Sequence, residues 1–150
     1  MRSSDTSVVD GAIFQDIARL RVFCFHTVMG EGELTSTQSL VILALNGDEG
    51  CKQGDLARAL GIRPVTLGGV VDRMEAKAWI ERRADKDDRR ANRIYLTDEG
   101  RALVQRVQHC LDQVNEVALK DVPARKLNEF FKVLTQIQRN LREFQIDVDK

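Results

Sequence analysis

Basic side chains cluster in one short segment of the sequence, between residues 82 and 93. The runs on either side of it, Trp79–Arg83 and Arg93–Leu96, read as strands, so the segment predicts a β-hairpin with a charged tip. Cations at such a tip can contact the phosphates of a duplex, and arginine gains most in a narrow minor groove. Arg90 is the first candidate for that role, with Asp88 placed to orient its guanidinium. The other cations of the segment are Arg82, Arg83, Lys86, Arg89 and Arg93.

Three of these further cations are candidate phosphate contacts. We expect Lys86 and Arg93 to lie beside the DNA backbone. Arg89 has two interpretations that the sequence leaves open: a phosphate contact, or an internal ion pair that holds the hairpin on the body of the protein. Each phosphate contact should steepen the salt dependence of binding by about one counterion.

Residues that could carry catalysis or bind a metal are few. The sequence has two histidines and no Gly-x-Ser-x-Gly, phosphate-loop or His-Glu-x-x-His pattern. We therefore expect no enzyme activity, no catalytic residue and no cofactor. His26, His109 and Cys110 are candidates for a metal site, but their spacing is poor for chelation, so no metal is expected. The three cysteines are scattered and do not form a disulfide framework.

The charges balance, because 23 basic and 23 acidic residues give a formal net charge of zero. Any affinity for nucleic acid must therefore come from uneven placement of charge. The first residues lack the apolar run of a signal peptide, and the longest apolar run, Leu40–Leu45, is too short to span a membrane. These features predict a cytoplasmic protein without a membrane partner.

Two short helices are expected in the first half of the chain. Thr35 and Gln38 form a capping box that opens a helix running through Leu45. Gln53–Leu60 reads as the second helix, and Gly61 is placed to end it in the left-handed conformation.

A third helix is predicted from Pro64 to about Lys77, because proline suits the first turn of a helix. Its apolar residues at offsets 0, 3, 4 and 7 would face the core: Leu67, Val70, Val71 and Met74. Two helices joined by a glycine-containing turn and followed by a hairpin predict a winged helix-turn-helix domain over residues 34–100. Thr97 would cap the helix that follows the hairpin.

The ends of the chain are predicted to be long helices, over Asp10–Met29, Asp98–Lys120 and Pro123–Gln145. Apolar residues recur along the first and the last of them at steps of three and four, and such seams are longer than one small domain can cover. We therefore expect residues 1–33 and 101–150 to form a dimerisation region. Its apolar residues are Ile13, Ile17 and Leu20 in the first helix, and Leu127, Phe130, Leu134, Ile137, Leu141 and Phe144 in the last.

This order of elements resembles the MarR family of bacterial transcription regulators. The family's wing pattern is Asp-x-Arg, five residues, Leu-Thr, two residues and Gly, which Asp88, Arg90, Leu96, Thr97 and Gly100 match. The resemblance implies a mainly α fold with a β-hairpin wing, in a homodimer that binds a pseudo-palindromic operator, usually as a repressor. It also implies that a small ligand or an oxidant releases the DNA.

The expected recognition helix, residues 64–77, departs from the family pattern. Arg63 stands where an acid or serine often caps the helix, and Gly68-Gly69 stand where Thr-Arg is common. A glycine pair costs helix stability, on the order of 1 kcal/mol each, and removes two side chains from the face that would enter the major groove. Specificity would then depend more on groove shape. Ala78 also replaces a frequent glycine. The remaining expected contacts are Arg63, Pro64, Val65, Thr66, Gly69, Arg73 and Gln53, with the wing, residues 84–93, in the minor groove.

An effector site is the least specified feature. The resemblance places a pocket among the first, second and fifth helices, where Phe23, His26, Leu40 and residues 104–108 are candidates that are equally good core residues. Cys24 is a candidate oxidant sensor by the same resemblance, although a buried cysteine usually packs as a small hydrophobe. A different interpretation of the whole chain is an interaction or effector-binding module that keeps the fold without specific operator binding.

Overall fold

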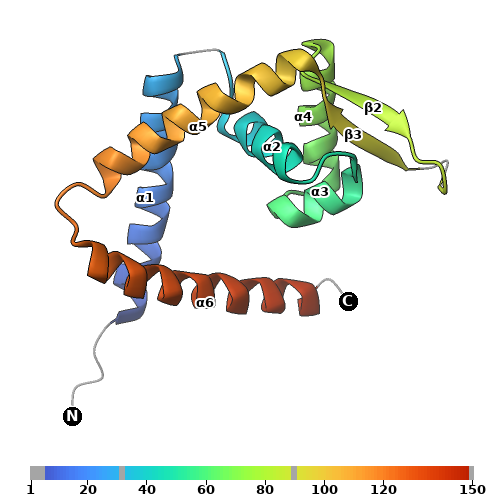
Figure 1. Cartoon of the computed structure of the whole chain (residues 1–150). Coiled ribbons are helices and arrows are strands. Elements are labelled where there is room, and N and C mark those ends of the chain that lie inside the picture. Colours follow the sequence, from blue (N-terminus) through green and yellow to red (C-terminus); the bar gives the residue numbers. More distant parts are fainter. Residues whose placement is uncertain (1–5, 31–32, 89–90, 149–150) are drawn as a thin grey trace. The chain divides into compact units, whose positions relative to one another are not determined.

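The computed structural model describes residues 6–30, 33–88 and 91–148, and divides the chain into two units, residues 1–115 and 116–150. The chain is mainly helical and contains one small sheet (Figure 1). The helices are α1 (Thr6–Met29), α2 (Ser36–Gly47), α3 (Gln53–Leu60), α4 (Pro64–Ala76), α5 (Asp98–Ala118) and α6 (Ala124–Val148), and the strands are β1 (Cys51–Lys52), β2 (Ile80–Ala84) and β3 (Asn92–Leu96).

The winged helix-turn-helix predicted from the sequence is confirmed. Helices α3 and α4 form the motif, and β2 and β3 pair antiparallel from Ile80↔Leu96 to Ala84↔Asn92 as the wing. The two-residue strand β1 was not predicted; it pairs with β3 and gives the sheet the order β1-β3-β2. The predicted helix and strand boundaries differ from the observed ones by a few residues, most at α1, which begins at Thr6 rather than Asp10.

Local signals in the sequence account for the helix ends. The Thr35 hydroxyl accepts from the Gln38 backbone N–H at 3.2 Å, while the Gln38 side chain accepts from the Thr35 N–H at 2.9 Å, which completes the capping box. Gly61 ends α3 with φ of 65°, a left-handed conformation that glycine adopts without steric cost. Pro64 occupies the first turn of α4.

The core lies in the first unit, where α2, α4 and α5 pack with the sheet. The stripe predicted on α4 is buried, as are Leu56 and Ala57 of α3. Burying a side chain of this size contributes roughly 1.5–3 kcal/mol each. The largest fully buried side chains are Ile42, Leu45, Leu67, Met74, Ile80 and Ile94. No helix among the described residues is long and apolar enough to cross a membrane.

The second unit contains the last residues of α5, a turn and α6. The Val122 N–H donates to the Leu119 carbonyl at 3.1 Å in that turn, and Asp121 has φ of 62°. Along α6 the predicted seam residues Leu127, Leu134 and Ile137 are half-buried, whereas Phe130, Leu141 and Phe144 are exposed.

A backbone joint connects the end of α4, the root of the wing and the start of α5. The Thr97 N–H donates to the Trp79 carbonyl at 3.1 Å, and the Thr97 hydroxyl donates to the Ala78 carbonyl at 2.5 Å. The same hydroxyl accepts from the Gly100 N–H at 3.1 Å, so Thr97 caps α5 as predicted. Ala78 reaches this joint with φ of 55°, in the region that favours glycine.

Gly100→Ala is expected to destabilise the protein because the new Cβ would overlap the carbonyl oxygen of Trp79, which is backbone and cannot rotate away. We expect a loss of about 2 kcal/mol or more in the free energy of unfolding, measured by urea denaturation. Gly54→Ala is the matched control, since no described atom lies within 4 Å of its Cβ position. Equal stability of the two variants would contradict this reading of the joint.

Candidate nucleic-acid interface

The first turn of α4 presents a group of predicted contact residues to solvent. Arg63, Pro64, Val65 and Thr66 are all exposed, and Val65 has 89% of its surface accessible. The next residue, Leu67, is fully buried and fixes this turn on the core. An exposed valine and threonine beside an arginine can meet a thymine methyl group and base edges in a major groove.

The glycine pair of α4 is not required by the packing of this chain. A Cβ on Gly68 would lie 3.6 Å from Gln53 Nε2, and one on Gly69 would lie 3.6 Å from Arg73 Nη1. Both distances are ordinary van der Waals contacts. Side chains could therefore fit at both positions in the free protein, and their absence leaves the backbone of α4 open to close approach.

Arg82, at the root of the wing, binds the two helices of the motif. Its Nη1 donates to Glu75 Oε2 at 2.5 Å and its Nη2 to Asp72 Oδ1 at 2.5 Å, both on α4. Its Nε donates to Gln53 Oε1 of α3 at 3.3 Å. Burial alone would lower the pKa of the Arg82 guanidinium, but the hydrogen bonds to Asp72 and Glu75 raise it. Arg82 is therefore a permanent cation held by acids of α4.

Asp85 organises the turn that leads to the wing tip. Its side chain is fully buried, and Oδ1 accepts from the backbone N–H groups of Asp87 at 2.9 Å and Asp88 at 2.8 Å. Oδ2 accepts from Arg93 Nε at 2.5 Å, and Lys52 Nζ lies 3.9 Å from Oδ1. Burial alone would raise the pKa of Asp85, but the two N–H groups and the Arg93 guanidinium together lower it. A buried carboxylate with this many donors stabilises one conformation of the turn.

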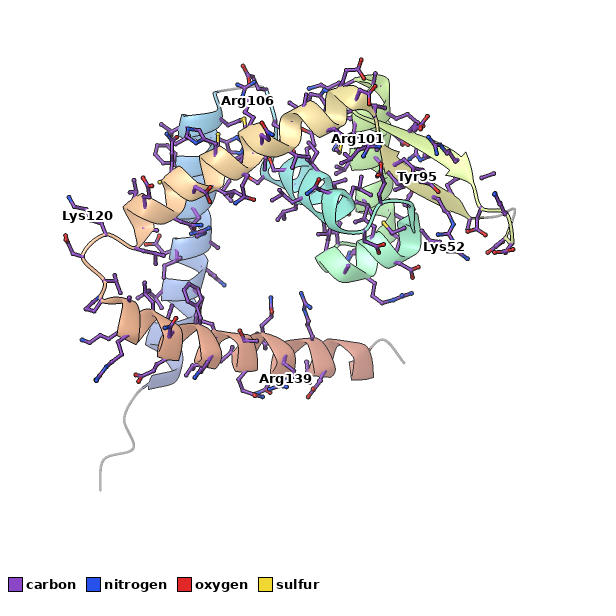
Figure 2. The ribbon with its side chains drawn as sticks, viewed as in Figure 1. Lys52, Tyr95, Arg101, Arg106, Lys120 and Arg139 are labelled. Carbon is purple, nitrogen blue, oxygen red and sulfur yellow. The ribbon has the colours of Figure 1, made fainter. Side chains whose placement is uncertain are left out.

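Arg93 ties the wing to the loop before β1. Besides Asp85, it donates from Nη1 to the Gly50 carbonyl at 2.8 Å, and the pairing with Asp85 raises its pKa. Figure 2 shows Lys52 and Tyr95 beside this part of the hairpin. The Arg83 guanidinium packs over the Tyr95 ring, 4.2 Å from the ring centroid. The sequence did not reveal this internal use of Arg93, and its contact with a phosphate stays a prediction.

The predicted contacts thus divide into three groups. Lys86 and Asp88 are exposed near the tip, and Arg73 is exposed on α4. Gln53 and Arg93 have internal partners. Arg89 and Arg90 lie outside the described residues. The residues that shape the wing and that sequence reasoning missed are Arg82 and Asp85, whose partners are visible only in three dimensions.

The predicted effector residues do not converge on one site. Phe23 and Leu40 are exposed. Cys24 is half-buried against the core, and His26 Nε2 lies 3.4 Å from the Ser36 hydroxyl. A cavity of about 260 Å³ is lined instead by Met29, Glu33, Leu34, Lys77, Trp79, Leu103, Arg106 and Val107. Only Arg106 and Val107 belong to the predicted stretch 104–108. The effector assignment stays a prediction.

The surroundings of Cys51 keep its thiol protonated. Burial, followed by the nearby Asp48, raises the pKa of the Cys51 thiol, which makes it a poor nucleophile. Among the described residues, no group of three or more potential metal ligands gathers in one place.

Asp85→Asn should show the electrostatic role of the buried carboxylate through its pH dependence. The pKa of Asp85 is lowered on folding, so its stabilisation is complete above the ordinary value of about 3.9 and disappears as pH falls through the folded value. The variant should be less stable than wild type at pH 7 by urea denaturation, and this gap should narrow below about pH 4. Asp87→Asn, at an exposed neighbour, is the control; a gap that stays constant down to pH 3 would contradict the assignment.

Comparison with known proteins agrees with this geometry. Residues 33–91 match the model of the MarR family. A probable transcriptional regulator from Pseudomonas aeruginosa is 27% identical with a TM-score of 0.77, over 85% of this chain and 95% of that one. BpsR of Bordetella bronchiseptica is 24% identical with a TM-score of 0.79, over 85% and 97%. PcaV of Streptomyces coelicolor is 24% identical with a TM-score of 0.81, over 93% and 98%. The helix-turn-helix and wing region of this chain, residues 33–91, thus matches the MarR family of winged-helix transcription regulators.

Proposed function

We propose that the protein is a homodimeric repressor that binds a pseudo-palindromic operator in double-stranded DNA. Helix α4 lies in the major groove, and the wing, residues 84–93, lies in the minor groove. The observation that carries this proposal is the exposed first turn of α4 beside a wing that Arg82 holds near its root and Asp85 holds at its tip turn. A wing that is held near its root and at its tip turn lets the cations of the tip reach a phosphate backbone without first losing conformational entropy.

Selection from a pool of random duplexes tests the proposal directly. The enriched sequences should contain two symmetric half-sites about one helical turn apart, because each subunit of a dimer reads one of them. Failure to enrich any sequence would contradict operator binding. It would favour the alternative, an interaction or effector-binding module that keeps the fold without specific operator binding.

Arg90→Ala should weaken binding to the enriched duplex and reduce its salt dependence. Removing one phosphate or minor-groove cation lowers the slope of log K against log salt by about one. The measurement is fluorescence anisotropy of a labelled duplex at several salt concentrations. Arg139→Ala, which removes an exposed arginine of α6, is the matched control. An unchanged slope in Arg90→Ala would remove this residue from the interface.

Gly69→Ala should change stability and DNA affinity in opposite directions. Alanine fits the free protein and raises helix propensity by on the order of 1 kcal/mol, so the free energy of unfolding should rise. The added methyl group would hold the α4 backbone away from the groove, so affinity for the enriched duplex should fall. Gly11→Ala in α1, where no described atom lies within 4 Å of the Cβ position, should raise stability alone.

The dimer is supported by apolar surface that a single chain leaves exposed on α1 and α6. Leu141 and Phe144 expose 65% and 70% of their surface, and Phe130 is also open. Ile13, Phe14, Ile17 and Leu20 are exposed on α1. Exposed apolar side chains that gather along a helix mark interaction sites.

Leu141→Glu should shift the protein toward monomer, because a charge buried in an apolar interface loses its hydration. Sedimentation equilibrium measures the change. Gln138→Glu, at an exposed position one turn earlier on α6, should leave the dimer intact. Monomeric wild-type protein would contradict the proposal.

Release by a small ligand is supported by the relatives. The regulation of DNA binding of BpsR is by 6-hydroxynicotinic acid, and PcaV has been solved in complex with its natural ligand. We propose that this protein also releases its operator on binding a small molecule.

A further inference from the structure

Strand β2 is an edge of the wing sheet, and one acid of α4 holds that edge. The sheet order β1-β3-β2 leaves β2 with one neighbour, so the Arg82 N–H has no strand partner. It donates to Glu75 Oε1 at 3.1 Å, while Arg82 Nη1 donates to Glu75 Oε2. One carboxylate therefore binds the backbone and the side chain of the same residue. Two points of attachment fix the orientation of β2 relative to α4 as well as its distance.

The opposite side of the wing is attached to different elements. Strand β3 pairs with β1, and Arg93 donates to the Gly50 carbonyl. In the described chain, the hydrogen bonds and ion pairs between β2 and α4 are those of Arg82. On the β2 side, these bonds of Arg82 add to the backbone joint at Trp79 and Thr97 in setting the angle between the wing and α4.

Arg82 also pairs with two carboxylates of α4. Asp72 and Glu75 are one turn apart on the helix, and the guanidinium, whose side chain is 19% exposed, lies between them. Without this cation, two carboxylates of α4 would face the phosphates of a bound duplex unpaired, and like charges repel at this range.

We propose that Arg82 is a positioning residue that sets the angle between the wing and α4, so that both engage adjacent grooves of the operator at once. Arg82 acts through Glu75 and does not itself touch DNA. This inference rests on the proposed function and extends it from the residues that meet DNA to the residue that aligns them.

A double-mutant cycle tests the mechanism with the enriched duplex. Arg82→Ala and Glu75→Ala should each lose about tenfold in affinity, a usual effect of separating contacting residues, and the double variant should lose no more than either. Hydroxyl-radical protection in the minor groove should disappear in all three, while protection of the major groove from dimethyl sulfate remains. Arg101→Ala, which removes an ion-paired arginine of α5, should keep both footprints.

The salt dependence distinguishes positioning from direct contact. Loss of the whole wing should lower the salt slope by more than the value of about one expected for a single phosphate contact. The proposal would be overturned if the affinity losses of Arg82→Ala and Glu75→Ala multiplied in the double variant, the salt slope changed by about one and the minor-groove footprint stayed intact. Arg82 would then be a phosphate contact.

Amide hydrogen exchange without DNA separates this inference from the proposed function. Exchange at residues 80–84 should accelerate in Arg82→Ala and in Glu75→Ala, and should stay at the wild-type rate in Arg101→Ala. If wild-type protein binds no duplex, the proposed function fails. If wild-type protein binds, but Arg82→Ala keeps both footprints and the wild-type exchange rate, the positioning role fails alone.

Discussion

The carbonyl group of Trp79 is the constraint on which the DNA-binding part depends. It accepts the Thr97 N–H at 3.1 Å and lies where any side chain on Gly100 would stand. The end of α4, the root of the wing and the start of α5 therefore meet within a few backbone atoms. Ala78 adopts a left-handed conformation to reach this point, at a cost of roughly 1–2 kcal/mol for a residue with a Cβ. Because protein interiors pack densely, a displacement of α5 at this joint must move the wing root as well.

The cations of the wing fall into two groups with different partners. Arg82 near its root pairs with the half-buried Glu75, and Arg93 near its tip pairs with the buried Asp85, which gives the hairpin a defined direction. Lys86 at the tip is exposed. Buried pairs of this kind stabilise one arrangement when every hydrogen bond is satisfied, and in the described chain no buried side-chain polar atom lacks a partner. Different residues thus determine the shape of the wing and its proposed contacts with DNA.

Sequence reasoning succeeded where the physics is local. The capping box, the glycine that ends α3, the proline that begins α4 and the buried stripe of α4 all depend on residues within one or two turns. It failed where partners are distant: Arg82 and Gln53 are 29 residues apart, and Arg93 and Gly50 are 43 apart. Strand β1 was missed because two residues carry no periodicity. Charge clustering identified the wing but could not tell which arginines turn inward, so Arg93 was predicted only as a DNA contact.

The internal ion pairs of the wing have a consequence for how such a regulator would search a genome. A protein with balanced charge, in which Arg82 and Arg93 of the wing are paired with its own acids, attracts bulk DNA weakly. Each encounter with unrelated sequence would then be brief, and fewer molecules would be sequestered on the millions of competing sites. A modest number of protein molecules could then keep an operator occupied. Because salt screens the cations that contact DNA, occupancy of the operator would also respond to changes in intracellular ionic strength.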